Sequence, residues 1–184
     1  GVHFLLEVDM NKAIAQRMET SVSDIRRQFR DNNIKFNSLS LNNNAIVLQF
    51  ANNADRDTAM DFLRRNGNEY TQQAVATASG ASLRLSYTDA RRQEIESYAV
   101  NQNLTTLRNR INELGVAEAL VQTQGSNRIV VELPGVQDTA EAKRVLGRTA
   151  NLEFRLVADQ NDQYIDPYTG KYNGQPLPPG TELF

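Results

Sequence analysis

The feature that most constrains the fold of this chain is an internal repeat. The segment IRRQFRDNNIKF resembles LRNRINELGVAE, with apolar residues at matching positions, and the likeness continues into the segments that follow each of them. Three pairs of segments align: 25–36 with 107–118, 44–63 with 127–146, and 81–87 with 150–156. Because a duplicated pattern predicts a duplicated structure, we expect both copies to fold in the same way.

Each copy shows the pattern of a helix, two strands, a second helix and a further strand. Apolar residues three and four apart mark the helices, and short apolar or alternating runs mark the strands. The first copy is expected to have helices at 10–29 and 54–65 and strands near 35–41, 45–51 and 81–88. The second is expected to have helices within 89–114 and near 138–148, with Asp138 as an N-cap, and strands near 118–124, 127–133 and 151–157.

A leading strand, HFLLEV at 3–8, completes a β-α-β-β-α-β order in the first copy, which is the order of a ferredoxin-like unit. The strand at 81–88 is then expected to serve both copies. The predicted class is α+β, with duplicated ferredoxin-like units whose mainly antiparallel sheet carries helices on one face. Alternation predicts that Ile129, Val131 and Leu133 are buried. The pattern leaves open whether the strands form one continuous sheet or two.

The composition changes near residue 159. The tail, 159–184, is rich in Gly, Pro, Asn and Tyr and has no apolar periodicity, which is typical of a linker. We therefore predict one folded domain over 1–158, with repeat one at 1–88 and repeat two at 89–158, followed by this linker.

Two segments of the second repeat are predicted to contact a partner. In the helix that contains LRNRINELG, the apolar stripe of Leu104, Leu107, Ile111 and Leu114 faces a core, and Gly115 is a natural helix stop. The polar residues of that helix point away from the core. The segment VELPG ends a strand with a turn, and exposed sheet edges and such loops can bind extended polypeptide. The predicted contact residues are Arg108, Arg110, Glu113, Val131, Glu132, Leu133, Pro134 and Gly135. The simpler interpretation is that these residues are a solvated helix face and a connecting loop.

Charge and composition exclude several classes of function. The 20 Lys and Arg against 22 Asp and Glu give a net charge of −2, so the chain has no general attraction for nucleic acid. RNA-recognition domains share the predicted strand order, but they stack bases on aromatic strand residues, and RIVVEL has none. The chain has no cysteine, and its apolar runs are far shorter than the roughly 20 residues of a membrane-spanning helix.

Motifs for catalysis, cofactors and metals are missing from the sequence. The single histidine, His3, is a poor basis for a catalytic triad, and Glu7 with Asp9 is better explained as a solvated strand face than as an acid pair. No Walker loop, dinucleotide-binding glycine motif or zinc-protease motif is present. A calcium loop starting at Asp159 fails because Tyr164 occupies the glycine position. We expect no catalytic residue, no cofactor and no metal.

The second repeat carries a long recognisable stretch. Residues 107–157, which contain LRNRINELGVAEALVQTQGSNRIVVELPG, closely resemble the SecD family of bacterial protein-export subunits, and GVHFLLEVDM at 1–10 resembles that family's opening after its first membrane helix. The resemblance implies a non-enzymatic role in secretion, in which SecD assists late preprotein translocation driven by the proton gradient. Implied partners are SecF, the Sec translocon channel and the unfolded preprotein.

The resemblance also implies a location and a place in the parent protein. The parent would be embedded in the bacterial inner membrane, with this soluble part on the periplasmic side as the base of the first periplasmic domain. The tail at 159–184 would lead toward a separate head subdomain. Two alternatives stay open: a porter-like periplasmic domain of another proton-driven exporter, and a small ferredoxin-like hydrolase acting on phosphate esters or acyl phosphates.

Overall fold

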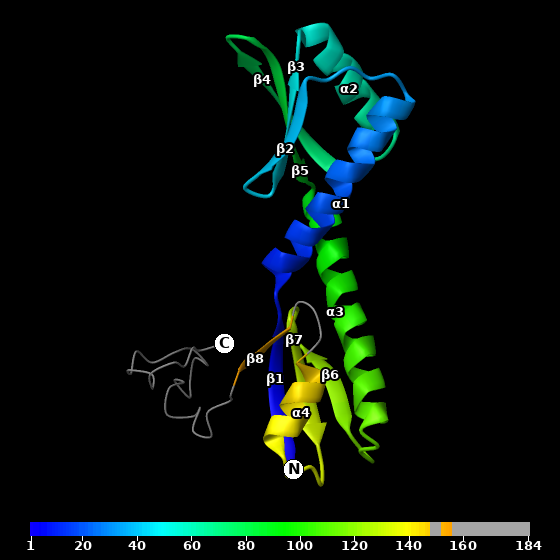
Figure 1. Cartoon of the computed structure of the whole chain (residues 1–184), viewed down its shortest axis with the longest axis vertical. Coiled ribbons are helices and arrows are strands. Elements are labelled where there is room, and N and C mark those ends of the chain that lie inside the picture. The colour runs from blue at the N-terminus through cyan, green and yellow to red at the C-terminus, as the bar shows by residue number, and fades with distance from the viewer. Residues whose placement is uncertain (148–151, 156–184) are drawn as a thin grey trace, which may run out of the picture.

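The computed structural model describes residues 1–147 and 152–155, which form two lobes joined by two long helices (Figure 1). Each lobe contains one four-stranded antiparallel sheet. The elements are β1 (Val2–Val8), α1 (Met10–Asp31), β2 (Ser38–Asn42), β3 (Ala45–Phe50), α2 (Asn53–Arg65), β4 (Tyr70–Thr77), β5 (Gly80–Tyr87), α3 (Asp89–Glu113), β6 (Leu120–Gln124), β7 (Arg128–Leu133), α4 (Thr139–Leu146) and β8 (Leu152–Arg155).

The predicted class is confirmed, and the question of one sheet or two is settled in favour of two. The strand orders are β2-β3-β5-β4 in the first lobe and β6-β7-β1-β8 in the second. In each lobe helices cover one face of the sheet (Figure 1). As predicted from alternation, Ile129, Val131 and Leu133 are buried, whereas Val130 and Glu132 are half-buried on the other face.

The leading strand does not complete the first copy's sheet, and that prediction was wrong. β1 lies between β7 and β8 in the second lobe, with Leu6 opposite Ile129. Among the described strands, β5 pairs only with β3 and β4, so it does not serve both of these sheets. The cause is geometric: one residue separates β1 from α1, and a helix of 22 residues is about 33 Å long, so it carries the chain into the other lobe. α3 carries the chain back.

The two lobes therefore exchange their first strands. The chain is a tandem pair of β-α-β-β-α-β units, in which β1 and β5 are equivalent and so are β4 and β8. With this equivalence the orders β4-β5-β3-β2 and β8-β1-β7-β6 are the same. The predicted alignment of 81–87 with 150–156 is consequently wrong, because β5 is a central strand and β8 an edge strand. The edge strand β4 was not predicted at all.

Each lobe has its own apolar core. In the first lobe, the ring of Phe29 on α1 meets those of Phe36 and Phe62 edge-on, with centroids 5.8 and 5.9 Å apart. In the second, Leu104, Leu107 and Ile111 of the predicted stripe share a core with residues of β1 and β7, and Leu107 is fully buried. Leu114, the fourth residue of the predicted stripe, is the half-buried C-cap of α3 and lies outside that core. Ile95, near the start of α3, belongs to the first core, so α3 contributes to both.

Helix ends follow local sequence signals. The predicted N-cap Asp138 is confirmed, since its Oδ1 accepts hydrogen bonds from the backbone N–H groups of Ala140 and Glu141 at 3.0 and 3.1 Å. The predicted stop at Gly115 is also confirmed: α3 ends at Glu113, and Gly115 has φ +69°, a conformation that glycine adopts without strain. Within the described ranges no helix is long and apolar enough to cross a membrane. The predicted linker lies outside the described residues.

Candidate functional site

The two arginines of the predicted contact helix tie the second lobe together. Arg108 donates a hydrogen bond from Nη2 to the backbone carbonyl of Val121 at 3.2 Å, joining α3 to β6. Arg110 donates from Nη1 to the carbonyl of Leu146 at 3.2 Å, joining α3 to the end of α4. Both guanidinium groups therefore hold helices and strands in place. Glu113, in the last turn of α3, is exposed.

The predicted contact strand is mostly interior. Val131 and Leu133 are fully buried, and β7 is hydrogen-bonded to β1 on one side and β6 on the other. Their side chains belong to the core, and β7 has no open edge for an added strand. Glu132 is half-buried, with its carboxylate 3.6 Å from the His3 ring. Within 131–135, only the turn residues Pro134 and Gly135 are exposed. The candidate contact surface of this segment therefore consists of the turn and the polar residues near it.

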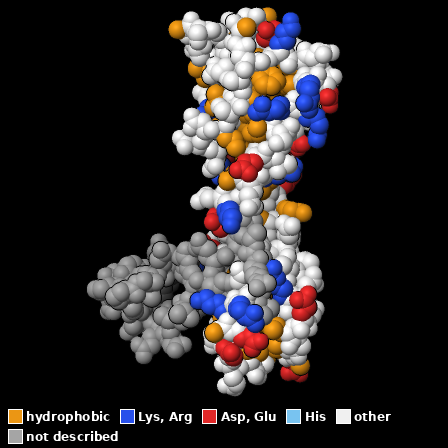
Figure 2. All heavy atoms as spheres, viewed as in Figure 1, with side chains coloured by type: hydrophobic (Ala, Val, Ile, Leu, Met, Phe, Trp, Pro, Cys, Tyr) orange, Lys and Arg blue, Asp and Glu red, His pale blue; other side chains and the backbone are white. Residues whose placement is uncertain are grey.

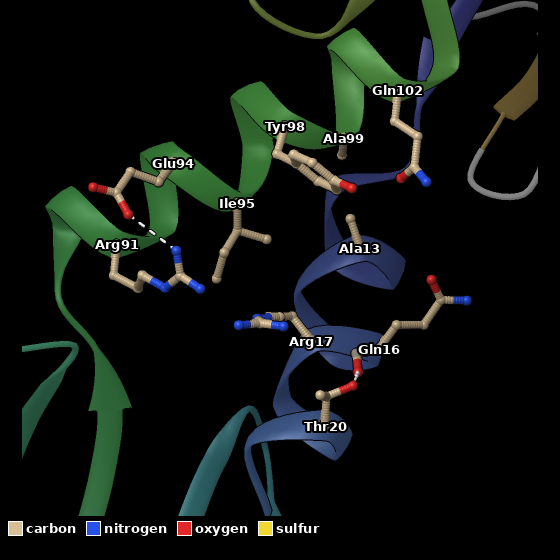
Figure 3. A pocket seen from close by; sticks show the side chains of 10 residues that line it. All are labelled: Ala13, Gln16, Arg17, Thr20, Arg91, Glu94, Ile95, Tyr98, Ala99 and Gln102. Atoms are coloured by element: carbon tan, nitrogen blue, oxygen red, sulfur yellow. Dashed lines mark hydrogen bonds and ion pairs between the residues drawn. The ribbon is translucent and has the colours of Figure 1, made fainter. Parts of the chain in front are cut away.

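A groove lies between the two long helices. It has a volume of about 550 Å³ and opens along one face of α1 and one face of α3 (Figure 3). Its lining residues recur at three-and-four spacing on each helix, as residues on a common helical face must. They are Ala13, Gln16, Arg17 and Thr20 from α1, and Arg91, Glu94, Ile95, Tyr98, Ala99 and Gln102 from α3.

The two arginines of the groove differ in their surroundings. Arg91 is held by Glu94 at 3.0 Å and by Glu69 at 3.7 Å, and only 20% of its side chain is exposed. Arg17 extends from α1 into the space between the helices (Figure 3) and forms neither a hydrogen bond nor an ion pair within the described part of the chain. A guanidinium group without a carboxylate partner is an available binding group for an anionic ligand.

The α3 side of the groove is apolar at its floor and aromatic at its rim. Ile95 is buried, and Ala99 beside it is buried too. The ring of Tyr98 projects from α3 over the gap (Figure 3) and is 68% exposed, which is the largest exposure of any large apolar side chain in the described ranges. Tyrosine is one of the residues enriched at protein interfaces, so this exposed ring is a candidate contact for a partner.

A stacked pair of tyrosines, the buried Tyr87 and the half-buried Tyr70, lies next to this region. The hydroxyl groups of Ser21 and Tyr87 are 2.6 Å apart, and the rings of Tyr70 and Tyr87 are stacked with centroids 5.7 Å apart. Burial raises the pKa of Tyr70 to about 12 and also raises the pKa of Tyr87, while the nearby Arg17 charge opposes both shifts. Both tyrosines therefore stay neutral at physiological pH, and Arg17 finds no counter-charge there.

Sequence reasoning did not find the groove. Its two sides come from helices that are far apart in the chain, and they meet only because the exchanged strands place α1 beside α3. Neither helix face has a recognisable motif. Over residues 1–147 and 152–155, no group of three or more His, Asp or Glu residues could hold a metal ion. Figure 2 shows acidic and basic side chains mixed over the visible face, without a large patch of one sign.

Comparison with known proteins identifies the family. The profile described as "Protein translocase subunit SecDF, P1 domain, N-terminal" matches residues 100–159. The chain is 49% identical to the protein translocase subunit SecD of Pseudomonas aeruginosa over 159 residues, or 86% of this chain. It is 44% identical to the SecD of Escherichia coli strain K12 over 164 residues, or 89% of this chain. The chain belongs to the SecD family.

This SecD-family chain spans about a quarter of the length of these relatives, 26% in both cases. The predicted resemblance is confirmed, and the match extends through both repeats, including the first, where the likeness was mainly one of pattern. These relatives are named as protein translocase subunits, which agrees with the prediction of a role in protein export.

Proposed function

We propose that this chain is the periplasmic base of a SecD subunit and assists the late stage of preprotein translocation that the proton gradient drives. The observation that carries the proposal is the 44–49% identity to SecD over 86–89% of the chain. Its partners in this role are SecF, the Sec translocon channel and the unfolded preprotein. The parent protein is anchored in the inner membrane, and the segment 159–184 links the base to a separate head.

The exchanged strands suit a part that transmits movement. Each sheet contains a central strand that continues directly into a helix packed in the other lobe: β1 leads into α1, and β5 leads into α3. The lobes cannot separate without withdrawing a strand that is hydrogen-bonded on both sides. We infer that a displacement of one lobe is passed to the other through these shared strands and helices.

Contact with the neighbouring subunit is proposed at the far end of the second lobe. Here the exposed turn at Pro134 and Gly135, with Glu132 beside it, offers polar and backbone groups. The exposed Glu113 and the outer parts of Arg108 and Arg110 lie at the end of α3 in the same lobe. These residues form the candidate subunit-contact surface.

A chimera tests the proposal. In Escherichia coli SecD, this chain replaces the matching segment, and the secretion rate of a precursor is followed in cells lacking their own SecD. We expect the chimera to restore secretion, and we expect a chimera with Leu6→Ala, which disrupts the second lobe, to restore much less. A chimera that is present in the membrane at the normal level and folded, as judged by protease resistance, yet secretes no better than cells without SecD would contradict the proposal.

A further inference from the structure

We propose that the groove between α1 and α3 binds an extended polypeptide segment that carries a carboxylate, with Arg17 as the partner of that carboxylate. This inference rests on the proposed function, since a translocase subunit meets unfolded polypeptide. It places the contact with polypeptide between α1 and α3, which join the two lobes, away from the candidate subunit-contact surface.

Charge is the first argument. Arg91 already has two carboxylates within ion-pair distance, at 3.0 and 3.7 Å, so it has little attraction left for another anion. Arg17 has none within the described residues and faces the same space (Figure 3). A single available guanidinium group matches a single carboxylate, which it can bind through two parallel hydrogen bonds. Polyanions such as nucleic acid fit poorly, because Arg17 offers one positive charge, whereas Arg91 is already paired with Glu94 and Glu69.

The remaining lining groups match a polypeptide backbone and its apolar side chains. The amide side chains of Gln16 and Gln102 each offer donors and an acceptor, which are the groups that pair with peptide N–H and C=O. The exposed ring of Tyr98 and the buried Ile95 offer an apolar surface between them. The volume of about 550 Å³ lies within the usual range of ligand sites. A small carboxylate alone would leave most of these groups unused.

Peptide titration of the isotope-labelled 184-residue chain tests the inference. The probe is the blocked pentapeptide acetyl-Ala-Val-Asp-Leu-Ala-amide, and its matched partner has Asn in place of Asp. We expect saturable shifts of backbone amides in 13–20 and 91–102, with the Asp peptide binding at least fivefold more tightly. Arg17→Gln is expected to remove this preference and leave both peptides at the affinity of the Asn peptide.

Arg30→Gln is the matched control, because Arg30 is an exposed residue on the same helix but outside the groove and the substitution removes the same charge. It should leave the fivefold preference intact. Equal affinity for the two peptides, or an equal loss in both variants, would overturn the inference. Sodium acetate at the peptide's concentration should cause no saturable shift, and the same shifts with acetate would show an anion site without polypeptide recognition.

Failure of this inference and failure of the proposed function are distinguishable. If the chimera restores secretion but Arg17 makes no difference to peptide binding, only the groove assignment is wrong. If the chimera folds and does not restore secretion, the proposed function is wrong, whatever the groove binds in solution.

Discussion

Because the lobes exchange their first strands, a substitution in β1, at the start of the chain, is expected to destabilise the second lobe. Leu6 and Leu85 occupy equivalent places in the central strands β1 and β5, and both are fully buried. Replacing such a leucine by alanine removes buried apolar surface and leaves a cavity, which costs about 2–5 kcal/mol. Leu6→Ala should weaken the second lobe, although Leu6 precedes the whole first repeat. Leu85→Ala should weaken the first.

The loss of free energy of unfolding can be measured separately in each lobe. A loss of about 2 kcal/mol raises the rate of amide hydrogen exchange through unfolding about thirtyfold, since about 1.4 kcal/mol is a factor of ten. In Leu6→Ala we expect this acceleration in β7 and the second half of α3, with β3 and α2 close to the unsubstituted protein. In Leu85→Ala the pattern should be reversed. The two variants remove the same groups at equivalent positions, so each is the control for the other.

Two results would contradict this prediction. If Leu6→Ala accelerates exchange in β3 and α2 while β7 stays protected, β1 belongs to the first lobe and the exchange is wrong. If both variants accelerate all amides equally, the two cores do not act as independent units, contrary to the separate packing seen here.

Three further predictions follow from the helix cap and the tyrosine pair. Ser21→Ala should lower the free energy of unfolding by about 1–3 kcal/mol, because it leaves the buried hydroxyl of Tyr87 without the 2.6 Å partner, and chemical denaturation measures this; no change would mean that solvent replaces Ser21. Burial raises the pKa of Tyr70 from 10.0 to about 12, so the stability that comes from the neutral tyrosine is intact below pH 10 and is lost as the pH rises toward 12. The melting temperature should therefore fall between pH 10 and 12, and it should fall less in Tyr70→Phe. Asp138→Ala should cost about 1 kcal/mol of stability through loss of the α4 cap, whereas Asp138→Asn should cost little; equal losses would argue against the cap.

The helices were predictable because they depend on local pattern. The stripe that includes Leu107 and Ile111, the cap at Asp138 and the stop at Gly115 each act within a few residues, and the structure has each helix within a few residues of its expected range. β4 was not predicted because it lacks such a local pattern. Its sequence, YTQQAVAT, lies at a sheet edge with most side chains exposed, so it lacks the apolar alternation that marks a half-buried strand.

The sheet that contains β1 was not predictable from local pattern. Phe4, Leu6 and Val8 alternate as a strand of either sheet would, and strand pairing depends on contacts far apart in sequence. The groove depends on that same exchange, so it was hidden as well. For the predicted contact residues, the sequence showed that Arg108 lies off the apolar stripe, but it did not show that its guanidinium group binds a carbonyl of β6.

The most direct test of polypeptide binding in the groove is a titration of the isotope-labelled chain with an unfolded secretory precursor, in which the shifts of backbone amides are followed. We expect saturable shifts in 13–20 and 91–102, along the groove, which are weakened in Arg17→Gln and retained in Arg30→Gln. No shift at a saturating precursor concentration, or shifts that Arg17→Gln leaves unchanged, would contradict it.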